Sequence, residues 1–280
     1  MAVASLMVLL LSSCVKKEIF YTPHPDKGVV AAKADFSNRS NECPAPQEYR
    51  LLHTCCGEAS PYVLASAEEK NLSELFEPDS HVFHAWNECE GMSVSAGKIN
   101  IDIANGNLEN MPGYIFTSRM ENIVVKDDTT RIVIPMQQRV RDVHFEITVT
   151  EGDPELIVSV TGTLTGVAST FDIENQSIIG EGQTTLINFS RNGDKLTADI
   201  RLLGFIGSSP TLTLDVQFVD NREQTVENEN FAEAVKDFGS NITETLVLTN
   251  NINIPIGTGM EATIEDWKAG NGSGEDIEIQ

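Results

Sequence analysis

The back half of the chain alternates apolar and polar residues at every second position. Between Val143 and Val149, and again between Leu212 and Phe218, each apolar residue is followed by a polar one. Side chains of a β-strand point alternately to its two faces, so this period buries one face and leaves the other in water. The pattern predicts long strands that each cover a hydrophobic core with one face.

Two further strands are predicted at Thr185–Phe189 and Leu196–Leu202, on either side of Asn192 and Gly193. An Asn-Gly pair is the strongest short signal for a β-hairpin, because both residues tolerate positive φ. We therefore expect these two strands to pair in antiparallel fashion.

The front half contains shorter and less regular strand candidates. The clearest alternation runs from Ile99 to Ile103, with Ile101 on the same face. A turn-rich acidic stretch, Lys126–Thr130, separates the two halves, and we place a domain boundary there. The front-half candidates are Val29–Phe36, Tyr49–Leu52, Tyr62–Leu64, Val82–Trp86, Ile99–Ile103 and Ile123–Val125.

Only two segments have the spacing of an amphipathic helix. Ser66–Phe76 carries Ser and Glu at the spacing of a capping box and ends before Pro78. Asn230–Phe238 places apolar residues on one face and is followed by Gly239 as a cap. Short strands, frequent turns and so few helices predict an all-β chain of antiparallel sandwiches with one or two short helices.

Acidic residues far outnumber basic ones, with 42 Asp and Glu against 19 Lys and Arg and a formal net charge of −23. This charge repels nucleic-acid phosphates and anionic lipid headgroups, so neither is expected as a partner. The stretch after Trp267 is rich in Gly, Asn, Ser and acidic residues, and we expect a flexible acidic tail there. Its last residues, Ile277–Gln280, could form a strand if a sheet edge were offered.

The first thirteen residues are nearly all apolar or small and lead into Leu11-Ser12-Ser13-Cys14. A membrane span needs roughly 20 apolar residues, so this segment is too short to cross a bilayer. It resembles a bacterial lipoprotein signal peptide that ends at a lipobox cysteine. The resemblance implies removal of residues 1–13, acylation of Cys14 with palmitate-type chains, and a tether over residues 14–27. Residues 1–13 contain no Lys or Arg, which fits a truncated start; the alternative is a short buried helix.

Four further cysteines lie in the first third of the chain: Cys43, Cys55, Cys56 and Cys89. An exported protein meets an oxidising compartment, so we expect one or two disulfides among them, with three pairings possible. Cys55 and Cys56 are adjacent and would bridge to each other only with strain.

Candidate catalytic chemistry is sparse. The sequence has no Gly-x-Ser-x-Gly elbow, no nucleotide-binding glycine pattern and no His-Glu-x-x-His. A metal site built from His53, His81 and His84 with the nearby cysteines is the alternative to disulfides. Its spacing fits no zinc finger, and thiolates outside the cell compete with oxidation. We therefore expect no metal, no other cofactor and no enzymatic activity.

Several stretches are similar to one family of surface proteins. They are His24–Val30, Phe145–Val149, Val158–Ala168 and Leu212–Val219. Together with the lipobox cysteine, they resemble the FimB-type fimbrial anchor lipoproteins, a fimbrillin-like family of Bacteroidales. The resemblance extends over most of the chain after Cys14.

This resemblance implies two tandem transthyretin-like β-sandwich domains, over residues 28–126 and 127–280, on the outer membrane. It implies an anchor or minor subunit in fimbria or adhesin assembly, with fimbrial subunits or other surface proteins as partners. Such fibres join by strand donation, in which a segment of one subunit adds to a sheet of the next. Ile264–Gln280 is the candidate segment. The alternative is a surface lipoprotein that binds a glycan or protein ligand without polymerising.

Overall fold

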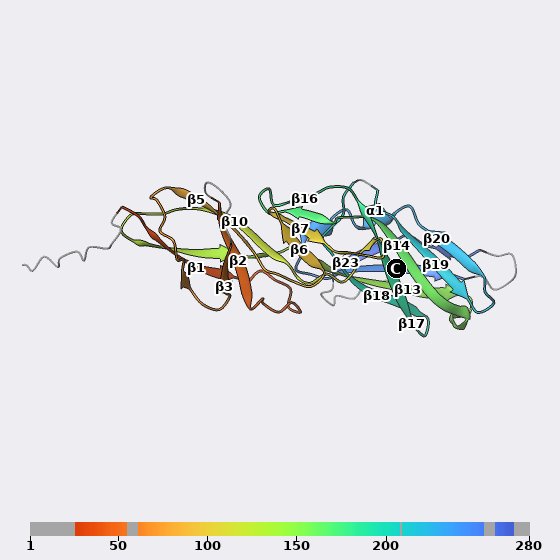
Figure 1. The fold of residues 1–280 in the computed structure, drawn as a ribbon. Helices are drawn as coiled ribbons and strands as arrows, with labels where there is room; N and C mark the ends of the chain where they lie inside the picture. The colour runs from red at the N-terminus through yellow and green to blue at the C-terminus, as the bar shows by residue number, and fades with distance from the viewer. Residues whose placement is uncertain (1–25, 55–60, 208, 255–260, 272–280) are drawn as a thin grey trace, which may run out of the picture.

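The computed structural model describes residues 26–54, 61–207, 209–254 and 261–271, and these contain many β-strands and very little helix. The molecule is elongated, with the first strands at one end and the long strands of the back half at the other (Figure 1). The predicted all-β class is confirmed. No helix in these ranges is long and apolar enough to span a membrane.

The N-terminal end consists of two sheets. Its strands are β1 (Val29–Asp35), β2 (Glu48–Thr54), β3 (Tyr62–Ala65), β4 (Lys70–Asn71), β5 (Ser80–Trp86), β10 (Phe116–Ile123), β11 (Thr129–Pro135) and β12 (Gln137–Gln138). One sheet has the order β11-β1-β4 and the other the order β12-β10-β5-β2-β3. Their apolar faces share one core, in which Tyr49, Phe83 and Phe116 are buried.

The sheets do not divide at the acidic stretch Lys126–Thr130. β11 lies almost wholly beyond it, yet β11 pairs in parallel with β1, with Val29 beside Thr129. Ile132 and Ile134 of β11 are buried in the N-terminal core. The acidic turn therefore connects β10 to β11 within the N-terminal end, because the apolar residues of β11 are needed to complete that core.

Four of the predicted front-half strands are confirmed as β1, β2, β3 and β5. The candidate Ile123–Val125 is wrong, because β10 ends at Ile123. The side chains of Ile123 and Val125 are exposed, and Val124 alone of the three is buried.

The helix predicted at Ser66–Phe76 is also wrong. The segment runs beside β1: Leu72 N–H donates to Val30 O at 2.8 Å, and Phe76 N–H donates to Gly28 O at 2.9 Å. Leu72 and Phe76 are buried, as their helical spacing suggested. Main-chain pairing with β1 holds them there instead, and it overrides a capping signal that contributes only about 1 kcal/mol.

A four-stranded sheet links the two halves of the sequence. Its strands are β6 (Met92–Ser95), β7 (Lys98–Ile101), β15 (Thr170–Asp172) and β16 (Ser177–Ile179), in the order β16-β15-β7-β6. A small hairpin follows β7, formed by β8 (Ile103–Ala104) and β9 (Asn107–Leu108). The predicted strand Ile99–Ile103 is therefore interrupted at Asp102; Ile99 and Ile101 are buried, whereas Ile103 is exposed.

The C-terminal end is built on a nine-stranded sheet. Its strands are β13 (Arg141–Glu151), β14 (Ile157–Val167), β17 (Gln183–Asn192), β18 (Lys195–Leu202), β19 (Leu212–Phe218), β20 (Glu223–Glu227), β21 (Leu246–Asn253), β22 (Thr263–Ile264) and β23 (Lys268–Asn271). The order is β20-β19-β14-β17-β18-β13-β21-β22, and β23 also pairs with β21. The pairing of β13 with β21 is parallel.

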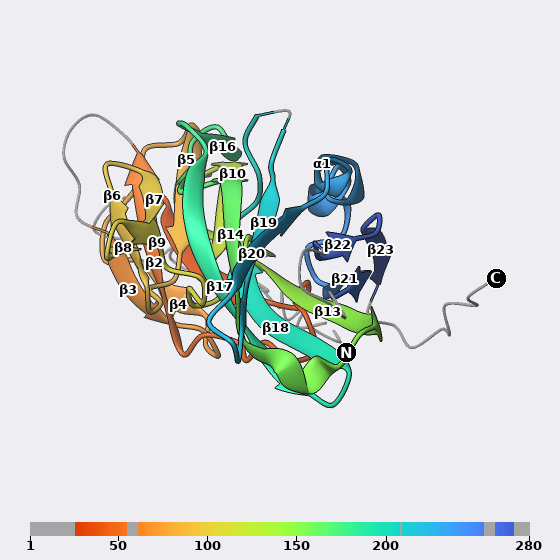
Figure 2. The same ribbon diagram turned by 90° about the vertical axis from the view of Figure 1, so that its right-hand side faces the viewer.

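This sheet curves around its own core (Figure 2). β17 belongs to both halves of the curve, because it pairs first with β14 and then with β18. The predicted alternation is confirmed, since no apolar residue of β19, or of β13 from Val143 to Val149, is more than 7% exposed. Hydrophobic burial on one face therefore determines the register of these strands.

The predicted hairpin is confirmed, but its turn begins one residue later than Asn-Gly suggests. Asn192 pairs with Lys195, which leaves Gly193 and Asp194 as the turn residues. Gly193 has a φ of 65°, whereas Asn192 and Asp194 are outside the left-handed region. Gly193 thus occupies the turn position that requires positive φ, as in a hairpin with glycine first.

The helix predicted at Asn230–Phe238 is confirmed in part. A single α-helical turn, α1 (Phe231–Ala234), is followed by a 3-10 turn, η2 (Phe238–Ser240). Phe231 and Phe238 are buried against the C-terminal core, as the pattern predicted. A second 3-10 turn, η1 (Pro154–Leu156), precedes β14.

The two ends are joined by an apolar contact and by polar contacts. Trp86, at the end of β5, packs in the C-terminal core. Tyr114 Oη donates to Asp142 Oδ1 at 2.7 Å, and His84 Nε2 lies 2.6 Å from Glu174 Oε2. The N-terminal sheets are thus fixed to the β15–β16 hairpin and to the start of β13.

Candidate functional site

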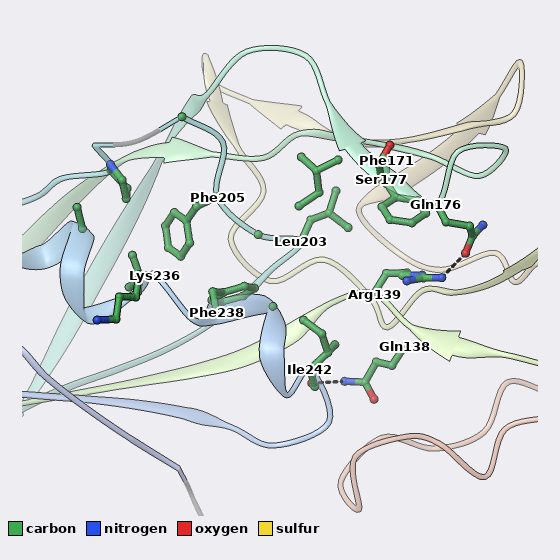
Figure 3. A pocket seen from close by; sticks show the side chains of 17 residues that line it. Gln138, Arg139, Phe171, Gln176, Ser177, Leu203, Phe205, Lys236, Phe238 and Ile242 are labelled. Carbon is green, nitrogen blue, oxygen red and sulfur yellow. Dashed lines mark hydrogen bonds between the residues drawn. The ribbon is translucent and has the colours of Figure 1, made fainter.

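A pocket with a volume of ≈ 560 Å³ lies where the C-terminal end meets the junction (Figure 3). Its lining comes from four separate segments. They are Gln138–Arg139, the β15–β16 hairpin with Phe171 and Ile178, the residues Leu203 to Phe205, Gly207 and Pro210 after β18, and the region from α1 through η2 to Ile242.

Aromatic side chains form the apolar wall of this pocket. The rings of Phe205 and Phe238 meet edge to face, with centroids 5.2 Å apart, and Phe231 lies behind them, 6.2 Å from Phe205. Phe238 is buried, whereas Phe205 is only half-buried. Phe205 is therefore the ring that this wall can present to a ligand.

Arg139 provides a cation at the opposite side of the pocket. Its Nε donates to Thr117 Oγ1 at 2.7 Å, another guanidinium nitrogen donates to Gln176 Oε1, and its Cζ lies 4.7 Å from the ring centroid of Phe171. Burial lowers the pKa of Arg139 to about 10, so the guanidinium remains charged at neutral pH. Within the described ranges, Arg139 has no carboxylate partner.

Arg141 lies behind the pocket wall and is almost completely buried. Its guanidinium donates to Phe238 O at 2.6 Å and to Glu244 O at 2.7 Å, and it contacts Asn271 Oδ1 at 3.5 Å. Main-chain carbonyls thus satisfy this charge. One side chain thereby connects η2, the entry to β21 and the end of β23.

The outer edge of β16 carries main-chain groups that have no hydrogen-bond partner among the described residues. Ile173 N–H donates to Gly97 O, and Ser169 O accepts from Ile101 N–H, so the odd-numbered residues of β15 face β7. Thr170 and Asp172 therefore face β16, where they pair with Ile179 and Ser177. By this alternation, the N–H and C=O of Ile178 point away from β15.

The segment after β18 carries a second main-chain edge. Ala168 N–H donates to Gly204 O at 2.9 Å, and Ile206 N–H donates to Gly166 O at 2.8 Å. The N–H and C=O of Phe205 consequently face outward. The two edges are neighbours, since a Cβ at Gly204 would lie 2.5 Å from Ile178 Cδ1. The φ of 150° at Gly204 favours glycine at this position.

The C-terminal segment is only partly a separate tail. β22 and β23 pair in antiparallel fashion with β21, and between them Trp267 is buried in the C-terminal core. Its ring meets Phe145 at 5.8 Å and Phe231 at 5.9 Å. The expectation that the acidic tail begins directly after Trp267 is therefore wrong for Lys268–Asn271, because Trp267 holds that stretch on the sheet. Residues 272–280 lie outside the described ranges.

The predicted cysteine sites can be followed only in part. Cys14, Cys55 and Cys56 lie outside the described residues, so acylation and their pairing stay predictions. Cys43 and Cys89 are both free in the structure. Burial raises the pKa of Cys43 to about 11 and that of Cys89 to about 12, so both are neutral thiols at physiological pH.

The histidines considered as metal ligands make hydrogen bonds instead. His53 Nε2 lies 2.8 Å from His81 Nδ1, and His81 Nε2 donates to Glu77 O at 2.7 Å. His53 Nδ1 lies 3.2 Å from Glu74 Oε1. Desolvation by burial lowers the pKa of His53. In the part of the chain that the structure describes, no group of three or more His, Cys, Asp or Glu residues is placed to hold a metal ion.

Sequence reasoning did not find the pocket. Its residues come from segments up to about a hundred positions apart, as Gln138 and Ile242 illustrate. One signal was present: no acidic residue occurs between Asp128 and Asp142, although the chain is strongly acidic and this stretch contains both Arg139 and Arg141. A basic stretch without acidic residues in so acidic a sequence indicates a site of local positive charge.

The fold and this pocket define a β-sandwich protein with an open strand edge beside an aromatic cavity. Residues 80–271 match the family described as fimbrillin-A associated anchor proteins Mfa1 and Mfa2. The chain belongs to this family, and the predicted resemblance to fimbrial anchor proteins is confirmed.

Solved structures from related bacteria share the fold. A candidate adhesin of Bacteroides ovatus has a TM-score of 0.62 and 13% sequence identity, covering 92% of this chain and 98% of its own. The fimbrial anchor protein Mfa2 of Porphyromonas gingivalis has a TM-score of 0.60 and 10% identity, covering 87% and 97%. A candidate polysaccharide-binding protein of Bacteroides thetaiotaomicron has a TM-score of 0.57 and 8% identity, covering 88% and 97%. No curated protein matches the sequence.

Proposed function

We propose that this protein is a lipid-tethered anchor or minor subunit of a fimbria or adhesin on the outer membrane, and that it binds partner subunits without catalysing a reaction. The family match over residues 80–271 carries the proposal, because it makes the chain a fimbrial or adhesin-related surface protein. The tether follows from the lipobox-like sequence that ends at Cys14.

Strand addition to a sheet edge is the proposed means of assembly. The same kind of contact occurs within this chain, because β23 pairs with the edge of β21 and places Asn271 beside Leu246. In such a contact, main-chain hydrogen bonds supply affinity and alternate side chains supply register. A segment from a neighbouring subunit could be held in the same way at an edge that is left open.

The tether is tested by Cys14→Ser in the native host, with Cys89→Ser as the matched control. We expect Cys14→Ser to abolish palmitate labelling, to release the protein into the medium and to lower the number of fimbriae on the cell in electron micrographs. Cys89→Ser should leave all three unchanged. Acylated, membrane-bound Cys14→Ser protein would contradict the tether.

The assembly role is tested by deleting the gene. Normal fimbriae on such cells would contradict it, and loss of binding to a glycan array in the same cells would favour the non-polymerising alternative.

Removal of residues 272–280 tests the donor segment without disturbing Trp267. We expect an unchanged melting temperature and loss of association with fimbrial subunits in a pull-down; retained association would remove this segment as the donor.

A further inference from the structure

We propose that the pocket beside β16 is the acceptor site for an extended segment of a partner subunit, and that this segment alternates aliphatic and acidic side chains. The inference rests on the proposed function, because it assigns a partner-binding surface to a protein that joins subunits. Three features of the pocket, argued in turn, indicate this occupant.

The first feature is the open main-chain edge. The N–H and C=O groups of Ile178 and of Phe205 face outward from neighbouring stretches, and both residues line the pocket. No hydrogen bond to these groups occurs within the described ranges. An edge of this kind pairs with an added strand, so the occupant is an extended chain and not a compact ligand.

The second feature is the aromatic wall. Phe205 projects from the open edge itself, and the ring of Phe238 meets it edge to face at 5.2 Å in the same wall (Figure 3). Leu203 and Ile178 add aliphatic surface beside them. A strand paired with the edge would direct every second side chain toward this wall, so those side chains are apolar.

The third feature is charge. The protein has a net charge of −23, yet the residues that line the pocket include Arg139 and Lys236 and no Asp or Glu. Lys236 pairs with Glu233 outside the lining, whereas Arg139 has only neutral partners among the described residues. An acidic segment is therefore repelled by most of the surface and attracted here, which supplies both steering and specificity.

A labelled peptide of alternating glutamate and isoleucine, six residues long, tests the site on the purified protein by fluorescence anisotropy. We expect saturable binding, and binding weaker by roughly tenfold or more when lysine replaces glutamate, because a charge-assisted contact is lost. Arg139→Gln should weaken binding of the acidic peptide by about the same factor. The matched control is Arg222→Gln, which removes the same charge from an exposed turn outside the pocket and should leave binding unchanged.

The strand geometry is tested on the peptide, which avoids any effect on folding of the protein. N-methylation of every second peptide nitrogen should abolish binding when the methyl groups face the open edge and preserve it when they face away. Equal binding of both N-methylated peptides would overturn strand addition, and equal binding of the acidic and lysine peptides would overturn the charge assignment. If removal of residues 272–280 raises peptide affinity, the chain's own end is the occupant and the partner assignment is wrong.

A pull-down of fimbrial subunits separates failure of this inference from failure of the proposed function. Capture by the unaltered protein and weaker capture by Arg139→Gln would support the acceptor site. Equal capture by both would overturn the acceptor site and leave the proposed function intact. If the unaltered protein captures no fimbrial subunit while binding the acidic peptide at this pocket, the proposed function fails and the peptide-binding chemistry remains.

Discussion

Two strands of the N-terminal end are buried differently from long strands of the C-terminal end. In the C-terminal end, β13 and β21 alternate buried and partly exposed residues along most of their length. In the N-terminal end, β1 and β5 bury consecutive residues, over Val30–Ala32 and Phe83–Trp86. A strand that is covered on both faces loses the period-two pattern. The strength of alternation thus reports how many faces a strand buries, and not whether a strand is present.

The largest expected effect tests whether the two cores unfold together. Phe145 in the C-terminal core and Phe116 in the N-terminal core are both fully buried. Truncation of either to alanine should lower the free energy of unfolding by about 3 to 5 kcal/mol. Because Trp86 of β5 packs in the C-terminal core, we expect each variant to shift a single cooperative transition in denaturant melts.

Ile123→Ala is the control, since that side chain is exposed, and it should melt like the unaltered protein. Two separate transitions, each shifted by only one of the phenylalanine variants, would show that the ends are independent.

A smaller effect concerns the junction and its dependence on pH. Desolvation by burial lowers the pKa of His84 below its ordinary value of 6.5, and the nearby Glu174 opposes this shift. Below pH 6.5 the unfolded chain therefore binds a proton that the folded chain does not, so stability falls as the pH decreases from 7 toward 5. One such group changes the slope of the free energy of unfolding against pH by at most about 1.4 kcal/mol per pH unit.

Replacement of the titrating group by His84→Gln should flatten this dependence. Glu174→Gln should steepen the pH dependence, because this substitution removes an interaction that favours the charged imidazole of His84. Urea melts at several pH values measure both slopes, and identical slopes for the two variants would contradict the assignment of the pH dependence to His84.

The smallest expected effect concerns the β17–β18 turn of the C-terminal end. Gly193 has a φ of 65°, and a Cβ added there would meet no atom within 4 Å, so Gly193→Ala adds only left-handed backbone strain. We expect a loss of about 1 to 2 kcal/mol. Gly239→Ala is the matched control, since that residue also has open space but no positive φ, and its stability should not fall. Equal melting temperatures for both variants would contradict the turn assignment.

The sequence predicts four long strands of the C-terminal end, β13, β17, β18 and β19, because each buries one face and the hairpin at Gly193 is local. It does not predict the long strands β14 and β21 of the same sheet. It predicts the N-terminal end less well for two physical reasons. Ser66–Phe76 carries a helical spacing that pairing with β1 overrides, and the parallel contact of β1 with β11 joins segments about a hundred residues apart. The pocket was not predictable from periodicity, since Ile178 and Phe205 become an edge only through tertiary pairing.

The parallel contact between β1 and β11 has a mechanical consequence. β1 is the first described strand after the segment that carries Cys14, and β11 leads onward to the rest of the molecule. In the proposed anchor, the tether would pull on Val29 and the fibre on Pro135, which lie at opposite ends of this pair because the strands run in the same direction. Such a load shears the seven paired positions together instead of peeling them apart one at a time. If the protein is tethered as proposed, this pair would resist drag from flowing liquid.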